Sequence, residues 1–214
     1  MFNYLTKLPF LKRLIPSITT RYYKLSKKNK NFFKVGNIKF YLDYLDPLDR
    51  KMIISQKYEY DQVYYLEEKM NKDTFSHFLD VGANSGYYSF YFAKRISNLK
   101  IQAFEPNQDA YGKFLKTNSK NSFKNIEISN FGLSNVNKKV KMITWFKHGI
   151  AKTNSTILDK SHSTINSKIF EADLKIGDEV LNISNKKLIL KIDVEGHELC
   201  VLLGLKSTLN NNKC

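Results

Sequence analysis

Short apolar runs alternate with amphipathic stretches through the centre of the chain. Residues 75–81, 101–104 and 126–133 form runs that are typical of buried strands. Apolar side chains at helical spacing lie between them, over 86–96 and in a segment that Asn107 begins. This order predicts an α/β fold in which a mostly parallel sheet carries helices on both faces.

The alternation is interrupted once and then resumes. Residues 134–187 are largely polar apart from an alternating stretch at 138–145, and we expect an inserted hairpin and a long loop there. A strand over 188–194 and a helix over 198–209 restore the pattern. Insertions of this kind often shape the mouth of a substrate site.

A lead-in layer precedes the first strand of the sheet. Apolar runs at 32–35 and 38–42 flank a Gly-Asn turn and predict a hairpin. Helices are expected over 48–55, after Asp46-Pro47, and over 60–70. The chain therefore divides into a basic N-terminal arm, this lead-in layer and an α/β domain with its insertion: residues 1–31, 32–75 and 76–214.

The positive charge of the chain is concentrated near its N-terminus. Thirty-five Lys and Arg residues stand against 20 Asp and Glu residues, a net +15, and ten of the basic residues precede the first acid, Asp43. The remaining residues hold 25 basic and 20 acidic groups, a net +5. The charge therefore says less about a reaction than about what the N-terminus contacts.

Three interpretations of the basic arm remain open. The default is a solvated arm that is partly disordered. Apolar residues at helical spacing beside basic groups also suit a weak contact with an anionic membrane surface, although Pro9 and Pro16 would kink such a helix. Nucleic acid is the least favoured partner, because no aromatic motif for stacking RNA bases accompanies the charge.

Membrane-spanning and disulfide-rich classes are excluded. The apolar runs near the N-terminus are too broken for a secretory signal, and no stretch approaches the roughly 18 apolar residues of a membrane span. Cys200 and Cys214 cannot build a disulfide framework or a multi-cysteine metal site. We expect a cytoplasmic protein, peripheral to the membrane if the arm binds lipid.

The most informative stretch is a strand that runs into a glycine-containing turn and a helix, residues 78–86. Gly82 and Gly86 let the backbone turn tightly and approach a ligand, and the helix start offers free N–H groups to a carboxylate or phosphate. Asp80 precedes the first glycine. The Gly-x-x-x-Gly spacing differs from the Gly-x-Gly-x-x-Gly of dinucleotide-binding proteins.

A second acid stands at the end of the next strand. Glu105 follows Gly86 by nineteen residues. A carboxylate at this place is positioned to accept hydrogen bonds from both ribose hydroxyls of a nucleoside. A nucleoside clamp beside a short anion-binding turn fits S-adenosylmethionine.

Three motifs together resemble the FkbM family of S-adenosylmethionine-dependent methyltransferases. They are Asp80-Val81-Gly82-Ala83-Asn84-Ser85-Gly86-Tyr87-Tyr88-Ser89, then Phe104-Glu105-Pro106-Asn107, then Lys191-Ile192-Asp193-Val194-Glu195-Gly196-His197-Glu198. The resemblance covers about residues 34–209 and includes Tyr58-Glu59. It implies a Rossmann-like class I methyltransferase fold, with S-adenosylmethionine as the cofactor.

The resemblance also implies where the cofactor lies. Its methionine part would contact Asp80, Gly82, Ala83, Asn84 and Gly86. Glu105 would hold the ribose, with the adenine near Pro106 and Asn107 and near a segment at the end of the third strand: Gly132, Leu133 and Ser134.

The reaction needs positioning and a group that takes the proton of the attacking hydroxyl. Asp193, Glu195 and His197 are the catalytic candidates, with Asp193 and His197 ranked first. In an alternative, Asp193 and a neighbour would hold Mg²⁺, but only one carboxylate is convincingly placed, so we expect no metal site.

The sequence departs from the family pattern in three places. Asn135 stands where the family usually has Asp, and Lys175-Ile176-Gly177 stands where it often reads Thr-Leu-Asp. A complete enzyme of this type has a seven-stranded sheet, whereas five residues follow Leu209. We therefore expect a C-terminally incomplete fold that lacks the last three strands.

The resemblance implies an O-methyltransferase that acts on a hydroxyl of a sugar, a glycan or a polyketide-type small molecule. Two alternatives stay open. One is a truncated, non-catalytic remnant that binds a nucleoside or a partner, and the other is a basic RNA-associated protein.

Overall fold

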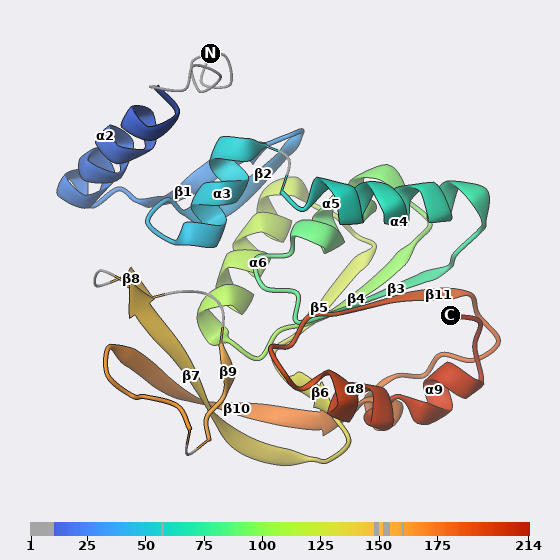
Figure 1. Cartoon of the computed structure of the whole chain (residues 1–214). Coiled ribbons are helices and arrows are strands. Elements are labelled where there is room, and N and C mark those ends of the chain that lie inside the picture. The colour runs from blue at the N-terminus through green and yellow to red at the C-terminus, as the bar shows by residue number, and fades with distance from the viewer. Residues whose placement is uncertain (1–10, 57, 148–149, 152–154, 160) are drawn as a thin grey trace.

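A parallel sheet forms the centre of the molecule (Figure 1). The computed structural model describes residues 11–214 except 57, 148–149, 152–154 and 160. Within these residues the sheet has four strands in the order β11-β3-β4-β5: Leu188–Ile192, His77–Val81, Lys100–Phe104 and Ile126–Ser129. All three strand pairs are parallel, so the connections must cross over the sheet, and helices form them as the alternating pattern predicts.

Successive residues of each strand face opposite sides, and two apolar clusters result. Phe78 and Ile101 belong to the larger cluster, which α4 (Tyr60–Lys72), α5 (Tyr87–Arg95) and α6 (Gln108–Asn121) cover. Leu79 and Phe104 belong to the second cluster, under α7 (Gly177–Val180), α8 (Glu198–Gly204) and α9 (Lys206–Asn210). The expected α/β fold with helices on both faces is confirmed.

Two of the expected elements are divided in the structure. A single strand over 126–133 is wrong: β5 ends at Ser129, and β6 (Gly132–Ser134) joins another sheet. At the break, the Asn130 side-chain amide donates to the Glu105 carbonyl at 2.8 Å and so holds the segment after β5 against the segment after β4. The prediction of a single helix over 198–209 is also wrong, because α8 ends at Gly204 and α9 begins at Lys206. Gly204 packs closely against the Ser134 carbonyl at this point.

The insertion forms its own sheet, whose long strands are the expected hairpin. β7 (Lys138–Lys147) and β10 (Ser167–Ile176) pair antiparallel from Lys138–Leu174 to Trp145–Ser167. β8 (Ile150–Ala151) and β9 (Thr156–Ile157) pair with β7, and β6 pairs parallel with β10. The turn at 130–131 therefore links the two sheets directly.

The lead-in layer packs on α6. It comprises β1 (Lys30–Val35), β2 (Ile38–Asp43) and α3 (Pro47–Ser55), and helix α2 (Leu11–Ser26) precedes it. Asp46 caps α3, and the Lys113 ammonium of α6 pairs with buried Asp49. Since a buried charge without its partner is strongly unfavourable, this pair fixes where α3 lies on α6.

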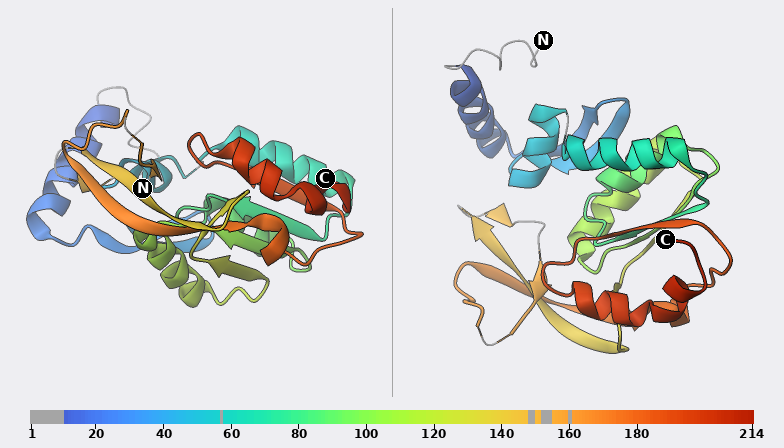
Figure 2. Two further views of the ribbon diagram at one scale, coloured as in Figure 1. Left: turned by 90° about the horizontal axis from the view of Figure 1, so that it is seen from below. Right: turned by 45° about the vertical axis from the view of Figure 1, so that its right-hand side comes forward.

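The first and the last described segments contact the rest of the fold. Residues 11–26 of the basic arm form α2, which lies at the periphery beside the hairpin (Figure 2). Near the C-terminus, Lys213 forms a parallel bridge with Lys187, and its carbonyl accepts the Leu188 N–H at 2.8 Å. Among the described helices, none combines the length and the apolar character that a bilayer crossing demands.

Candidate functional site

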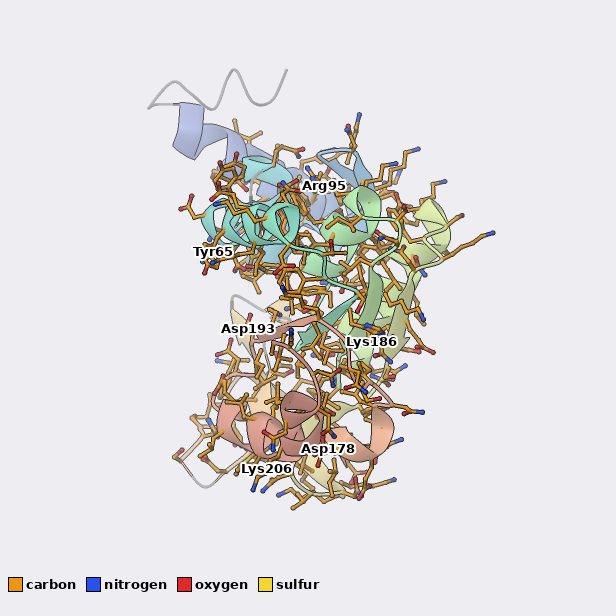
Figure 3. All side chains as sticks on the ribbon, turned by 90° about the vertical axis from the view of Figure 1, so that its right-hand side faces the viewer. Tyr65, Arg95, Asp178, Lys186, Asp193 and Lys206 are labelled. Atoms are coloured by element: carbon orange, nitrogen blue, oxygen red, sulfur yellow. The ribbon has the colours of Figure 1, made fainter. Side chains whose placement is uncertain are left out.

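A pocket of about 350 Å³ opens where the strands β3, β4 and β11 end. Asp193, just after β11, lies between the layer that carries Tyr65 and Arg95 and the layer that carries Asp178 and Lys206 (Figure 3). The wall combines the glycine turn, the ends of β4 and β11, the lead-in helices and the insertion. It consists of Leu48, Lys51, Met52, Tyr58, Glu59, Gly82, Ala83, Asn84, Ser85, Tyr87, Tyr88, Glu105, Pro106, Met142, Ser155, Lys191, Asp193, Val194 and Glu195.

The glycine turn is shaped by close backbone approach. Gly82 has φ +75°, and a Cβ on it would lie 2.0 Å from the Asp193 carbonyl oxygen. The N–H groups of Gly82 and Ala83 both donate to the Phe104 carbonyl, at 3.0 and 3.1 Å. A side chain at Gly82 would therefore push β11 away from β3 at the pocket.

Gly86 is needed for packing rather than for the pocket wall. It has φ +84°, and a Cβ there would lie 2.5 Å from the Phe114 ring. It is the N-cap of α5, and the Phe90 N–H donates to its carbonyl. Gly86 therefore sets the exit of the turn, and the structure places it behind the lining residues.

Glu105 is buried beside the turn. It is 5% exposed, and its two carboxylate oxygens accept the N–H groups of Asn84 at 2.7 Å and Asn107 at 2.8 Å. Burial raises the pKa of Glu105 to about 7, while these two bonds and the Lys191 charge act in the opposite direction. Carboxylate oxygens accept more than one bond each, so Glu105 keeps acceptor capacity toward the pocket.

Asp80 lies under the pocket and is not part of its wall. The Ser89 hydroxyl donates to one of its carboxylate oxygens at 2.7 Å, and the Lys191 ammonium lies 3.1 Å from the other. Lys191 also donates to the Gly82 carbonyl at 2.8 Å and lies 3.9 Å from the Asp193 carboxylate. The Lys191 ammonium, on β11, therefore contacts Asp80 of β3, the glycine turn and the exposed Asp193.

The structure separates the three catalytic candidates. Asp193 and Glu195 line the pocket, and the Asp193 side chain is 64% exposed. His197 is outside the lining set: it precedes α8, and its Nε2 lies 3.0 Å from the Ser134 hydroxyl. Burial lowers the pKa of His197, with the Lys138 charge acting the same way.

The expected adenine-side residues are only partly at the pocket. Pro106 lines it, whereas the Asn107 side chain caps α6 by accepting the Asp109 and Ala110 N–H groups. Gly132, Leu133 and Ser134 form β6, which pairs with β10 and packs against α8. The structure therefore brings Gly82, Ala83, Asn84, Glu105, Pro106, Asp193 and Glu195 together at the pocket and places Asp80, Gly86, Asn107, Gly132, Leu133, Ser134 and His197 around them.

Several lining residues carried no assigned role in the sequence. Lys51 and Met52 come from α3, and Tyr58 and Glu59 from the turn before α4. The Tyr88 hydroxyl donates to Glu59 at 2.7 Å, and burial raises the pKa of Tyr58 and of Tyr88. The one available signal was Tyr58-Glu59 within the family resemblance.

Glu59 adopts a backbone conformation that is unusual for its residue type. Its φ and ψ are both 43°, the left-handed region, and it stands at the N-cap of α4 without a side-chain cap. Strained backbone conformations of this kind are common at functional sites, where the surrounding structure stabilises them.

Among the described residues, no three His, Cys, Asp or Glu side chains lie close enough together to hold a metal ion.

A family model described as "Methyltransferase FkbM domain" matches residues 80–214. No curated protein matches the chain. The range that the family model matches includes the glycine turn, Glu105 and the motif at the end of β11. It thus spans the strand ends that build the pocket.

Two solved structures are similar to the chain at low TM-score. Coclaurine N-methyltransferase bound to N-methylheliamine and SAH has a TM-score of 0.31 and 15% identity, over 35% of this chain and 22% of that chain. Trm5b from Pyrococcus abyssi has a TM-score of 0.35 and 14% identity, over 51% of this chain and 34% of that chain. The chain thus spans about a fifth and about a third of the lengths of these two proteins.

Proposed function

The chain belongs to the FkbM methyltransferase family, and we propose that it transfers a methyl group from S-adenosylmethionine to a hydroxyl of a sugar, a glycan or a polyketide-type small molecule. The observation that carries this proposal is the buried Glu105 carboxylate in the pocket wall, 2.7 Å from the backbone N–H of Asn84 in the glycine turn. A buried acid beside a glycine-containing turn at the pocket suits the ribose of a nucleoside cofactor.

Five of the lining residues fit this cofactor, and we call them the cofactor wall: Gly82, Ala83, Asn84, Glu105 and Pro106. Glu105 would accept the ribose hydroxyls, because each of its oxygens has capacity beyond one backbone N–H. Gly82 has no side chain, so the turn can pack against the Asp193 carbonyl and bring the end of β11 to the pocket. When bound, the cofactor supplies an electrophilic methyl group.

A second group of lining residues, which we call the acceptor wall, would bind the substrate. It comprises Lys51, Tyr58, Glu59, Asp193 and Glu195. Tyrosine faces, carboxylates and an ammonium together offer stacking surface, acceptors and a donor to a molecule rich in hydroxyl groups. This composition supports a hydroxyl-bearing acceptor.

Asp193 would take the proton of the attacking hydroxyl. It lines the pocket directly after β11, and the Gly82 backbone packs against its carbonyl. Lys191 positions it, since the ammonium bridges toward both Asp80 and Asp193. Glu195 is the second candidate on the same wall, and the Ser134 contact of His197 favours a positioning role for that residue.

Calorimetric titration with S-adenosylmethionine tests the proposal. Wild-type chain is expected to bind, and Glu105→Ala is expected to weaken binding at least about tenfold because a charged hydrogen-bond acceptor is lost. Glu127→Ala, which removes an exposed acid of the neighbouring strand β5, is the matched control and should bind like wild type. Absence of binding by the wild type, or equal binding by Glu105→Ala, would contradict the proposal.

A further inference from the structure

Helix α2 presents an apolar stripe that no other part of the described structure covers. Ile18, Tyr22 and Leu25 are 61%, 59% and 77% exposed. Their spacing, four and then three residues, places them on one side of the helix. Isolated exposed apolar residues are ordinary, but three in a row along one helix face indicate a contact surface.

The orientation of this stripe is fixed by a different side of the helix, which packs on the rest of the protein. The Tyr23 ring lies 4.4 Å from the Tyr44 ring and 6.1 Å from the Phe33 ring, centroid to centroid. Thr19 adds a hydrogen bond to the Tyr44 hydroxyl. Because these contacts hold the inner face on the hairpin, the stripe points away from the protein.

The charge around the stripe has a single sign. Arg21 and Lys24 lie on the exposed part of α2, and Lys27 and Lys28 follow its end. No acidic residue occurs before Asp43. An apolar face flanked only by basic side chains complements a surface that is negatively charged outside and apolar beneath.

We propose that α2 docks this stripe on an anionic lipid bilayer, with the helix lying in the plane of the membrane surface. Ile18, Tyr22 and Leu25 enter the boundary between headgroups and acyl chains, and Arg21 and Lys24 contact the lipid phosphates. Two of the three stripe residues, Ile18 and Leu25, are aliphatic and give nucleic acid bases nothing to stack on. A second basic copy of the chain would bring like charges together. The bilayer is therefore the occupant that both features favour.

The docking surface is linked to the proposed site through the lead-in layer. Tyr44 directly follows β2 and lies in the short connection to α3, whose Leu48, Lys51 and Met52 line the pocket. Figures 1 and 2 show α2 at the outer corner of this layer. Membrane docking would thus hold the acceptor wall near the lipid surface.

Co-sedimentation of the full chain with lipid vesicles tests this proposal. We expect binding to vesicles of phosphatidylcholine and phosphatidylserine, weak binding to phosphatidylcholine alone, and weaker binding as salt rises. The double variant Arg21→Gln/Lys24→Gln should lose about 25-fold in affinity, at about fivefold per basic residue. The double variant Ile18→Ser/Leu25→Ser should lose at least about tenfold.

Two matched variants serve as controls. Leu199→Ser/Leu203→Ser removes two apolar residues exposed to a similar degree on α8, and Lys94→Gln/Lys206→Gln removes two exposed charges elsewhere. Both should sediment with anionic vesicles like wild type, and thermal melts check that all variants fold.

Equal binding to both vesicle types overturns the proposal. So does an unchanged affinity of both α2 variants, or a wild-type dimer that the Ile18→Ser/Leu25→Ser change separates. Cofactor binding, measured apart from vesicles, tests the methyltransferase proposal independently.

Discussion

The two walls of the pocket hold their carboxylates in opposite environments. Glu105 on the cofactor wall is 5% exposed and has a pKa raised to about 7, whereas the Asp193 side chain on the acceptor wall is 64% exposed. Glu105 is held by two backbone N–H groups, and Asp193 by a distant ammonium at 3.9 Å. A buried, rigid acid suits recognition of a constant ligand, and an exposed acid suits proton transfer to and from a variable one.

The largest expected effect concerns the acceptor wall. Asp193→Asn should lower the methyl-transfer rate by about 10²–10⁴-fold, because the amide cannot take the hydroxyl proton. S-adenosylmethionine affinity should stay within about threefold, since Glu105 is untouched. Asp173→Asn, an exposed acid of β10, is the control for both quantities. A loss of cofactor affinity as large as the loss of rate would show that Asp193 also binds the cofactor, which contradicts the separate roles of the two walls.

The next effect tests the backbone contact that joins the walls. Gly82→Ala should lower the free energy of unfolding by about 2–5 kcal/mol, because its Cβ would meet the Asp193 carbonyl oxygen and φ is +75°. Gly112→Ala lies in α6 with no atom near its Cβ and should raise stability by about 0.5–1 kcal/mol. Denaturant titration measures both. Similar values for the two variants would show that the turn tolerates a side chain.

A third effect follows from the raised pKa of Glu105. Between about pH 4.5 and 7 the folded carboxyl keeps a proton that the unfolded one has released, so stability falls as pH rises through this window. The wild type should lose up to about 3 kcal/mol relative to Glu105→Gln from the lower to the upper end. Unfolding titrations across this range measure the difference. A constant difference would show that burial does not raise this pKa.

The smallest effect concerns the support beneath the pocket. Ser89→Ala removes the hydroxyl that donates to buried Asp80 at 2.7 Å, and should lower the free energy of unfolding by about 1–2 kcal/mol. Ser119→Ala on the exposed side of α6 should change it by less than about 0.5 kcal/mol. Thermal unfolding compares them. Equal effects would mean that Asp80 needs no second partner besides Lys191.

The cofactor wall could be predicted from the sequence because its parts are local. Gly82 and Glu105 each follow a strand of a parallel sheet, and parallel strands end at a common edge, so their proximity follows from the element order. At Asn130 the chain leaves β5 and continues into another sheet, and the Asn130 side chain bonds to the Glu105 carbonyl there. Nothing in the apolar pattern of 126–133 reports that bond.

The acceptor wall could be predicted only in part because it is assembled from distant segments. Lys51 comes from a helix that a buried ion pair, Asp49 with Lys113, fixes on α6. Met142 comes from the insertion. His197 stands two residues after Glu195 in the sequence, yet the left-handed backbone at Glu195 (φ 50°) and Gly196 (φ 96°) turns the chain between them. Adjacency in the motif therefore does not make the three candidates neighbours in the pocket.

If Glu105 holds the ribose of S-adenosylmethionine, the affinity for the cofactor should depend on the ionisation of this carboxyl. Calorimetric affinity of the wild type should rise about tenfold from about pH 6 to about pH 8, as the carboxyl with a pKa of about 7 ionises and becomes the better acceptor. Glu105→Gln should bind the cofactor more weakly, and its affinity should not show this rise with pH. Titration of the cofactor's own groups is common to both proteins and cancels in the comparison. A wild-type affinity with the same pH dependence as Glu105→Gln would contradict the account.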